Sequence, residues 1–454
     1  MSTLNENSGP ELNSGSLAEV FRVALPLILV ASGNSVKLFC DRAMLSHFSN
    51  NQMEAAFTSG ITYFTLLVFF IAIVSYCNIF VSQYYGAGEY DRVGIVVWQG
   101  VFISVAAGAL LGTGLLWAEP LFALLGRDQS MQLDQVRYVK ILFAASVFPL
   151  MMVAFTSFWG GLGRTWMVLL IEFSTVVINI ILNYMLIFGN WGCPPLGIVG
   201  AAYGTVVSTF IGTVFAFLIF ISAENRKVFN TLPDRVFHFE IIKKILKFGV
   251  ENGVRAVLDV GAFNVFVIIL SYYGTLTGQA STITFTVNAL AFIPLFGIGN
   301  SISILVGQGI GSKNIELAQR VVKSGAAILT IYLTVSFLLL TVFNFIPLAL
   351  FNINSDLLRS TTSKYMFFVA VELVFNGIAI LYSSAISGAG DTNYPMKLTL
   401  YISWGVFALP LIVIYLSGLS STFAWLVFVF HVIPKAVILY YRYRSGLWEN
   451  MKVI

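Results

Sequence analysis

The sequence predicts an all-α polytopic membrane protein, with twelve transmembrane helices in two parallel-repeat six-helix lobes around a central cleft. Composition is the first observation behind this fold class. Of the 454 residues, 58% are hydrophobic and 10% are charged, whereas about a quarter of a soluble domain is charged. The second observation is that the apolar runs are continuous, which favours helices and excludes a membrane barrel. The third is an internal repeat.

Breaks in hydropathy divide the chain into twelve spans, and each is long enough to cross a bilayer, which takes about 20 residues. The first six predicted spans are 20–46, 53–82, 91–117, 136–160, 166–188 and 197–222. The other six are 245–273, 280–308, 317–343, 362–388, 394–416 and 421–443.

Both termini are predicted to lie in the cytoplasm. An even number of spans places them on one side of the membrane, and Lys and Arg are enriched in cytoplasmic loops. The opposite loops, such as "YYGTLTG" and "YLSGLSS", contain no Lys or Arg. The connection 223–244 is basic, with Arg226, Lys227, Arg235, Lys243 and Lys244. We therefore expect cytoplasmic tails at 1–19 and 444–454.

Two pairs of segments repeat between the halves of the chain. "VSQYYGAGEYDRVGIVVWQG" (81–100) shares V-x-Q-x-x-G and V-V-x-x-G with "VGQGIGSKNIELAQRVVKSG" (306–325), and "GGLGRT" pairs with "SGAGDT" at nearly the same offset. Two repeated segments in the same order in both halves indicate an internal duplication. Because six spans per half insert both halves the same way up, we expect an N-lobe at 20–222 and a C-lobe at 245–443. The basic loop 223–244 would join them on the inner membrane surface.

Ionisable side chains inside a span are functional candidates, because a charge at the bilayer centre costs on the order of 2.5–3.5 kcal/mol. In the first span, Asn34, Lys37 and Asp41 share one helix face. Lys37 and Asp41 are one turn apart and can pair. A self-neutralising pair near the outer end is the simpler alternative to a functional site.

The fifth span carries one polar stripe down an otherwise apolar helix. The spacing of Glu172, Thr175, Asn179 and Asn183 by three and four residues places them on one face. Such a stripe either lines a pathway or holds two helices together. Glu172 lies near the cytoplasmic end, where contact with water is the simpler interpretation.

The seventh span contains the row "GVENGVRAVLDVG", in which Glu251, Arg255 and Asp259 are one turn apart. One acid neutralises Arg255, and the surplus carboxylate then requires a proton or a cation. The alternative, a Glu251–Arg255 pair in a wet vestibule, leaves Asp259 unexplained. In the tenth span Glu372 and Asn376 are one turn apart. This spacing suits a carboxylate supported by an amide, and the alternative is that Glu372 is an acid at the outer membrane interface.

Motifs of several other protein classes are missing from the sequence. It contains no nucleotide-binding GxxxxGK[ST] loop and no nucleophile elbow, and its three cysteines and three histidines are scattered. We expect no enzyme activity, no resident cofactor or metal and no nucleic-acid partner. Uphill transport would then draw on an ion gradient or a partner protein.

Six segments carry a resemblance to a known family: "FCDRAMLSHFS", "VSQYYGAGEYDR", "GGLGRT", "NIILNYMLIFG", "VGQGIGSKN" and "SGAGDT". Together they resemble the multidrug and toxic compound extrusion (MATE) family, most closely its NorM-like bacterial branch. The resemblance implies a multi-pass protein of the bacterial inner membrane and a monomer in the lipid bilayer. It also implies a secondary antiporter that exports small amphipathic drugs or xenobiotics in exchange for H⁺ or Na⁺ by alternating access.

The resemblance also implies roles for the polar residues. It assigns cation coupling to Asp259, Glu372, Asn376 and Asp41, with Asp259 and Glu372 as a possible Na⁺ site. The substrate pathway is expected to include Asn34, Lys37, Glu172, Thr175, Asn179, Asn183, Glu251 and Arg255. Lys37 and Arg255 are not typical of the family, and a basic residue beside each acid favours H⁺. The alternatives are a lipid-linked precursor flippase of the same superfamily and an uncoupled channel or scaffold.

Overall fold

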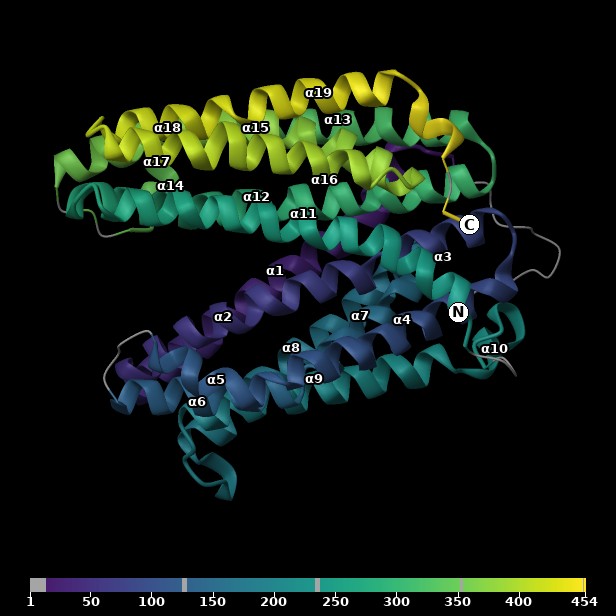
Figure 1. Cartoon of the computed structure of the whole chain (residues 1–454), viewed down its shortest axis with the longest axis horizontal. Helices are drawn as coiled ribbons and strands as arrows, with labels where there is room; N and C mark the ends of the chain where they lie inside the picture. The colour runs from purple at the N-terminus through teal and green to yellow at the C-terminus, as the bar shows by residue number, and fades with distance from the viewer. Residues whose placement is uncertain (1–13, 125–128, 233–236, 352, 354, 452) are drawn as a thin grey trace. The chain divides into compact units, whose positions relative to one another are not determined.

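The computed structural model describes residues 14–124, 129–232, 237–351, 353, 355–451 and 453–454. These residues fold almost entirely into helices, without a strand in the described ranges. Arg235 and residues 1–13 of the predicted N-terminal tail lie outside them. Figure 1 labels the helices and colours them along the chain, from purple at the N-terminus to yellow at the C-terminus.

The membrane-crossing helices confirm the predicted fold class. The described residues hold eleven helices long and apolar enough to cross a membrane, or twelve if one bent pair counts as a span. Those of the first half are α1 (Leu17–Phe48), α2 and α3 (Asn50–Ser75, Cys77–Gly86), α4 (Tyr90–Gly112), the bent pair α6 (Gln129–Ala144) and α7 (Val147–Gly161), α8 (Thr165–Phe188) and α9 (Ile198–Phe220).

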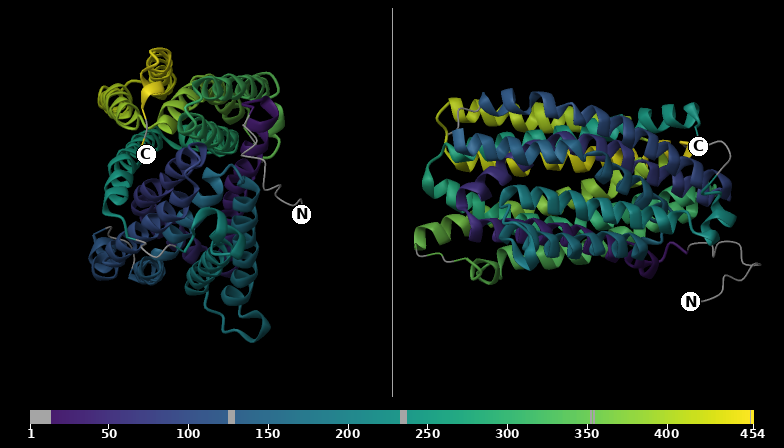
Figure 2. Two further views of the ribbon diagram at one scale, coloured as in Figure 1. Left: turned by 90° about the vertical axis from the view of Figure 1, so that its right-hand side faces the viewer. Right: turned by 90° about the horizontal axis from the view of Figure 1, so that it is seen from below.

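The second half contributes the remaining spans. They are α11 (Phe239–Ser271), α12 (Thr275–Gly311), α13 (Ile315–Thr341), α15 (Asp356–Ala389), the stretch of α16, η2 and α17 (Asn393–Thr399, Leu400–Ala408, Leu409–Leu416), and α18 with α19 (Ser421–Phe430, Val432–Arg444). Shorter elements are α5 (Gly114–Ala123), η1 (Asn190–Gly192), α10 (Ala223–Phe229), α14 (Phe345–Leu348) and η3 (Leu447–Asn450). α15 runs beside both α13 and α19 (Figure 1), and Figure 2 shows the same helices from two further directions.

Two spans depart from regular α-helix. The fourth bends by 43° between α6 and α7, next to Pro149, which has no N–H to donate to the Ala145 carbonyl. In the eleventh, η2 is a π-helix. Such segments are rare and frequently lie at functional sites. This one carries Ser403 and Trp404.

The chain forms two compact units. The N unit is residues 29–257, and the C unit is residues 1–28 with 258–454. The boundaries fall inside α1 and α11, so each of these helices contributes to both units. The lobes expected at 20–222 and 245–443 stay a prediction.

The repeat appears as the same turn in each unit. After the V-x-Q-x-x-G segments, the N–H of Glu89 donates to the Tyr84 carbonyl at 3.0 Å, and the N–H of Asn314 donates to the Gly309 carbonyl at 2.9 Å. Both turns need a positive φ at the preceding residue, which is Gly88 in one and Lys313 in the other. The repeat is therefore a repeat of structure.

The second pair of repeated segments, "GGLGRT" and "SGAGDT", forms the same close helix contact in each unit. Gly161 lies against the Asn78 carbonyl, and Gly388 lies against the Ser303 carbonyl, so a Cβ at either position would overlap backbone. Asn78 and Ser303 occupy matching places in the repeat, three residues before its first Val. Small residues allow such close approach of membrane helices.

We expect Gly388→Ala to destabilise the C unit by about 1–3 kcal/mol, because the added methyl must push α12 and α15 apart. Gly278→Ala, on α12, is the matched control, since a Cβ there meets no atom within 4 Å. The melting temperatures of the two purified variants, followed by intrinsic fluorescence, test this expectation. Equal melting temperatures would show that the glycine contact does not limit helix packing.

Candidate functional site

Asp259 lies on α11 where two other membrane segments reach it. The ammonium of Lys435, on α19, lies 2.9 Å from Asp259 Oδ1. The hydroxyl of Ser403, on η2, donates to the same oxygen at 3.0 Å. Next to this pair, Trp404 Nε1 donates to the carbonyl of Leu258 at 3.1 Å. The π-helix and α19 therefore each contribute one donor to the same oxygen of the Asp259 carboxylate.

Aromatic packing holds the α19 side of this arrangement. His431 is 8% exposed and stacks on Phe407, with ring centroids 4.1 Å apart. His431 lies one helical turn before Lys435, and its ring is within electrostatic range of both Lys435 and Asp259. The stacked pair fixes the start of α19 against the π-helix and so sets where Lys435 points.

Glu372 and Asn376 lie on α15, and the predicted support of the acid by the amide is present. Asn376 Nδ2 donates to Glu372 Oε1 at 2.7 Å. Glu372 is 3% exposed and lies near the middle of α15, which does not fit an acid at the outer interface. Among the described residues, its Oε2 is buried without a hydrogen-bond partner.

Lys435 connects the two carboxylates, because Glu372 is also within its electrostatic range. We call Asp259, Lys435, Glu372 and Asn376 the C-unit charge group. It carries a net charge of −1 when both acids are ionised. The sequence prediction does not include Lys435. The residue nevertheless lies well inside the predicted span 421–443, where the cost of a charge in the membrane makes it a functional candidate.

The N unit holds a second charge group, Asp41 with Asn183, Lys37 and Glu172. Asn183 Nδ2, on α8, donates to Asp41 Oδ1, on α1. Lys37 is within electrostatic range of both Asp41 and Glu172. Each unit therefore combines one lysine, two carboxylates and one asparagine that supports a carboxylate.

The polar stripe of α8 packs against α9. Asn183 also donates to Asn179 at 3.4 Å, and Asn179 donates to Thr205 of α9 at 3.4 Å. A Cβ at Gly204 would overlap Asn183 Oδ1, and one at Gly212 would overlap the hydroxyl of Thr175. The stripe thus joins two helices in this structure, and its role in a pathway stays a prediction.

The other predicted pathway residues lie on the parts of α1 and α11 that belong to the N unit. Asn34 is exposed on α1, and Glu251 and Arg255 are half-buried on α11. A group of three or more His, Cys, Asp or Glu side chains suited to a metal ion is not found in the ranges that the structure describes.

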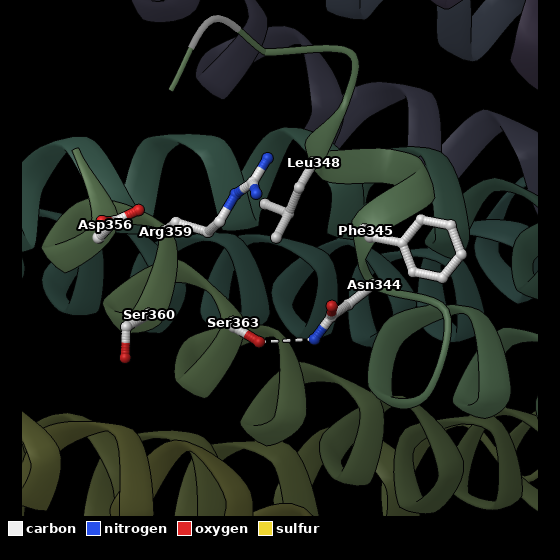
Figure 3. Close-up of a pocket in the computed structure, with 7 residues that line it drawn as sticks. All are labelled: Asn344, Phe345, Leu348, Asp356, Arg359, Ser360 and Ser363. Atoms are coloured by element: carbon white, nitrogen blue, oxygen red, sulfur yellow. Dashed lines mark hydrogen bonds between the residues drawn. The ribbon is translucent and has the colours of Figure 1, made fainter. Parts of the chain in front are cut away.

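Two pockets in the C unit lie away from the predicted site residues. One, of about 290 Å³, opens where α14 meets the start of α15, as Figure 3 shows. It is lined by Asn344, Phe345, Leu348, Asp356, Arg359, Ser360 and Ser363. The other, of about 320 Å³, lies between α13, α15 and α19 and is mainly apolar. None of the site residues predicted from the sequence lines either pocket.

Comparison with known proteins identifies the relatives of this chain. A family model described as MatE matches residues 26–185 and 254–416, one range in each half. The chain is 26% identical to the uncharacterized transporter YisQ of Bacillus subtilis, with 94% of each chain covered. It is 24% identical to the probable multidrug resistance protein NorM of Thermotoga maritima, with 96% of this chain and 95% of that protein covered.

Solved structures show the same fold. A MOP superfamily transporter from Pyrococcus furiosus, described as having a binding pocket of reverse polarity that suggests a different function, matches with a TM-score of 0.86. The identity is 16%, over 97% of this chain and 98% of that one. An outward-facing multidrug resistance MATE family transporter matches with a TM-score of 0.86 at 17% identity, over 98% of each chain.

The Asp259–Lys435 pair should show a favourable coupling energy of about 0.5–3 kcal/mol in a double-mutant cycle. Asp259→Asn alone removes the carboxylate that bonds to the ammonium of Lys435, whose side chain is only 17% exposed. Adding Lys435→Met removes the ammonium that has lost this bond and should restore part of the lost stability. Chemical denaturation of the purified variants checks this, and additive single effects would mean that the pair does not form.

Proposed function

The chain belongs to the MATE family of transporters, and on that premise we propose that it is a secondary active antiporter. It would export small amphipathic organic compounds, such as drugs or xenobiotics, in exchange for H⁺ or Na⁺. The observation that carries this proposal is the C-unit charge group, in which the ammonium of Lys435 is paired with Asp259 and lies within electrostatic range of Glu372.

The charge count of that group supports ion coupling. An ion pair that only stabilises the fold needs one acid for one base, whereas Lys435 faces both Asp259 and Glu372. Charges inside a membrane protein are costly and are retained mainly for function. The second acid therefore suits a group that gains and loses a proton or a cation during each transport cycle.

Alternating access then follows from differential binding. Binding of the coupling ion favours one conformation and binding of substrate favours another, so each drives release of the other. We assign coupling to Asp259, Glu372 and Asn376 in the C unit and to Asp41 in the N unit. Asn34, Lys37, Glu172, Thr175, Asn179, Asn183, Glu251 and Arg255 are assigned to the substrate pathway.

The names of the relatives support the substrate class. Several similar bacterial proteins are called probable multidrug resistance proteins, and transporters of this family need no cofactor. We propose a monomer in the bacterial inner membrane, with both termini cytoplasmic. The basic residues Arg226, Lys227, Lys243 and Lys244, in the connection before and at the start of α11, support that orientation.

Glu372→Gln should reduce gradient-driven efflux at least tenfold, because the amide keeps the shape of the side chain and cannot exchange a proton. Ethidium export from proteoliposomes, with H⁺ and Na⁺ gradients imposed separately, checks this. Glu240→Gln is the matched control, since Glu240 is an exposed acid at the start of α11. Efflux by Glu372→Gln equal to that of the wild type would remove Glu372 from the coupling machinery.

The same assay separates the other functions. Ethidium flux in the wild type that ignores both gradients would indicate an uncoupled channel. Absence of flux, together with movement of a fluorescent lipid between leaflets, would indicate a flippase. Either result would overturn the antiport proposal.

A further inference from the structure

We propose that Lys435 is a built-in counter-cation that makes the C-unit charge group selective for H⁺ over Na⁺. Its ammonium takes the place on Asp259 that a metal cation would otherwise take, and the exchangeable charge is a proton on Glu372. This inference rests on the proposed antiport function and names its coupling ion.

The surroundings of Asp259 are those of an anion that is already paired. The Lys435 ammonium and the Ser403 hydroxyl both donate to Oδ1, at 2.9 and 3.0 Å. The nearby carbonyl of Leu258 accepts from Trp404 Nε1. Hard cations bind where several oxygen atoms offer free lone pairs. Here an ammonium and a hydroxyl already bond to Asp259 Oδ1, and an indole N–H bonds to the neighbouring carbonyl, so two oxygen atoms that could bind Na⁺ are engaged.

Lys435 is held in this place by its helix. Its side chain is 17% exposed, and Val432, Ala436 and Leu439 on the same helix are buried. A covalently attached cation has a high effective concentration at its partner. Free Na⁺ must displace it and leave an ammonium unpaired in a poorly hydrated region, which is strongly unfavourable.

Glu372 is the carboxylate left for exchange. It is 3% exposed, Asn376 donates to Oε1, and the described residues provide no partner for the buried Oε2. A buried charged oxygen without a hydrogen bond is costly. Protonation of Oε2 removes that charge, and the group then consists of a neutral acid beside the Asp259–Lys435 pair. Loss of the proton gives the group a net charge of −1, and the ionised Glu372 is then within electrostatic range of the Lys435 ammonium.

The charged residues on the helices packed against α15 support this assignment. α12 and α18 contain no Asp, Glu, Lys or Arg. α19 contributes Lys435, with His431 just before it, and carries Arg442 and Arg444 in its last turn, where Arg442 pairs with Asp391. Glu449 of η3 accepts from Gln319 at the start of α13. Gly325 of α13 lies near Leu381 of α15, so the charged residues of α13 are more than two turns from Glu372. These are Glu316, Arg320 and Lys323. The remaining titratable side chain of α13 is Tyr332, whose hydroxyl donates to the Ala291 carbonyl.

The experiment compares wild type and Lys435→Met in sodium chloride and in choline chloride at equal ionic strength. The melting temperature of the wild type should not respond to Na⁺. Lys435→Met removes the ammonium from Asp259 Oδ1, so Na⁺ should bind in its place and raise the melting temperature by several degrees. Lys364→Met is the matched control, because Lys364 is an exposed lysine that donates to the hydroxyl of Thr422.

Proteoliposomes give the second readout. Ethidium efflux by the wild type should follow an imposed H⁺ gradient and ignore a Na⁺ gradient, and Lys435→Met should lose the H⁺-driven part. Lys435→Arg keeps the charge and should stay insensitive to Na⁺. A Na⁺-driven wild type, or a Lys435→Met variant that ignores Na⁺, would overturn the inference.

The outcomes also separate this inference from the proposed function. If the wild type shows no gradient-driven efflux with either ion, the antiport function fails. If efflux is driven by Na⁺, the antiport function stands and the role of Lys435 fails. Should Lys435→Met not fold, the response of the wild type to Na⁺, in melting temperature and in efflux, still decides the question.

Discussion

The ion pair between Lys435 and Asp259 is the interaction on which the charge group of the C unit depends. It joins α19 to α11 and is the point at which the π-helix also contacts α11. Loss of Asp259 would remove the carboxylate that pairs with the mostly buried side chain of Lys435, and loss of Lys435 would remove the ammonium that acts on both acids. Because the second change takes the net charge of the group from −1 to −2, the pair and the carboxylate on α15 must be considered together.

The fold brings these side chains together through a duplicated helix arrangement. The turns at Gly88 and Lys313 and the close contacts at Gly161 and Gly388 repeat between the units. On this common scaffold each unit places a lysine near two carboxylates, and the details differ. The N unit uses α1 and α8, whereas the C unit draws on α11, α15 and α19. Duplication thus preserved the backbone contacts while the charged residues took different positions.

Sequence patterns predicted the spans and the repeat because both follow from local composition and from motifs of several residues. They also placed Asn376 one turn from Glu372, since helical spacing fixes neighbours on one helix. They could not show that Lys435 of α19 reaches Asp259, because that contact depends on packing between distant segments. The π-helix that aims Ser403 was equally hidden, as "LYISWGVFA" looks like an ordinary apolar helix. Arg255, one turn from Asp259 on the same helix, was the basic partner that helical spacing alone could suggest.

Infrared difference spectroscopy of the purified protein during a pH titration tests the central claim most directly. The account predicts a band from a protonated carboxyl group that disappears as pH rises and is absent in Glu372→Gln. It further predicts that replacing choline by Na⁺ leaves the band of the wild type unchanged, because Lys435 already supplies the cation. A band that Na⁺ displaces, or a Glu372→Gln spectrum identical to that of the wild type, would contradict the account.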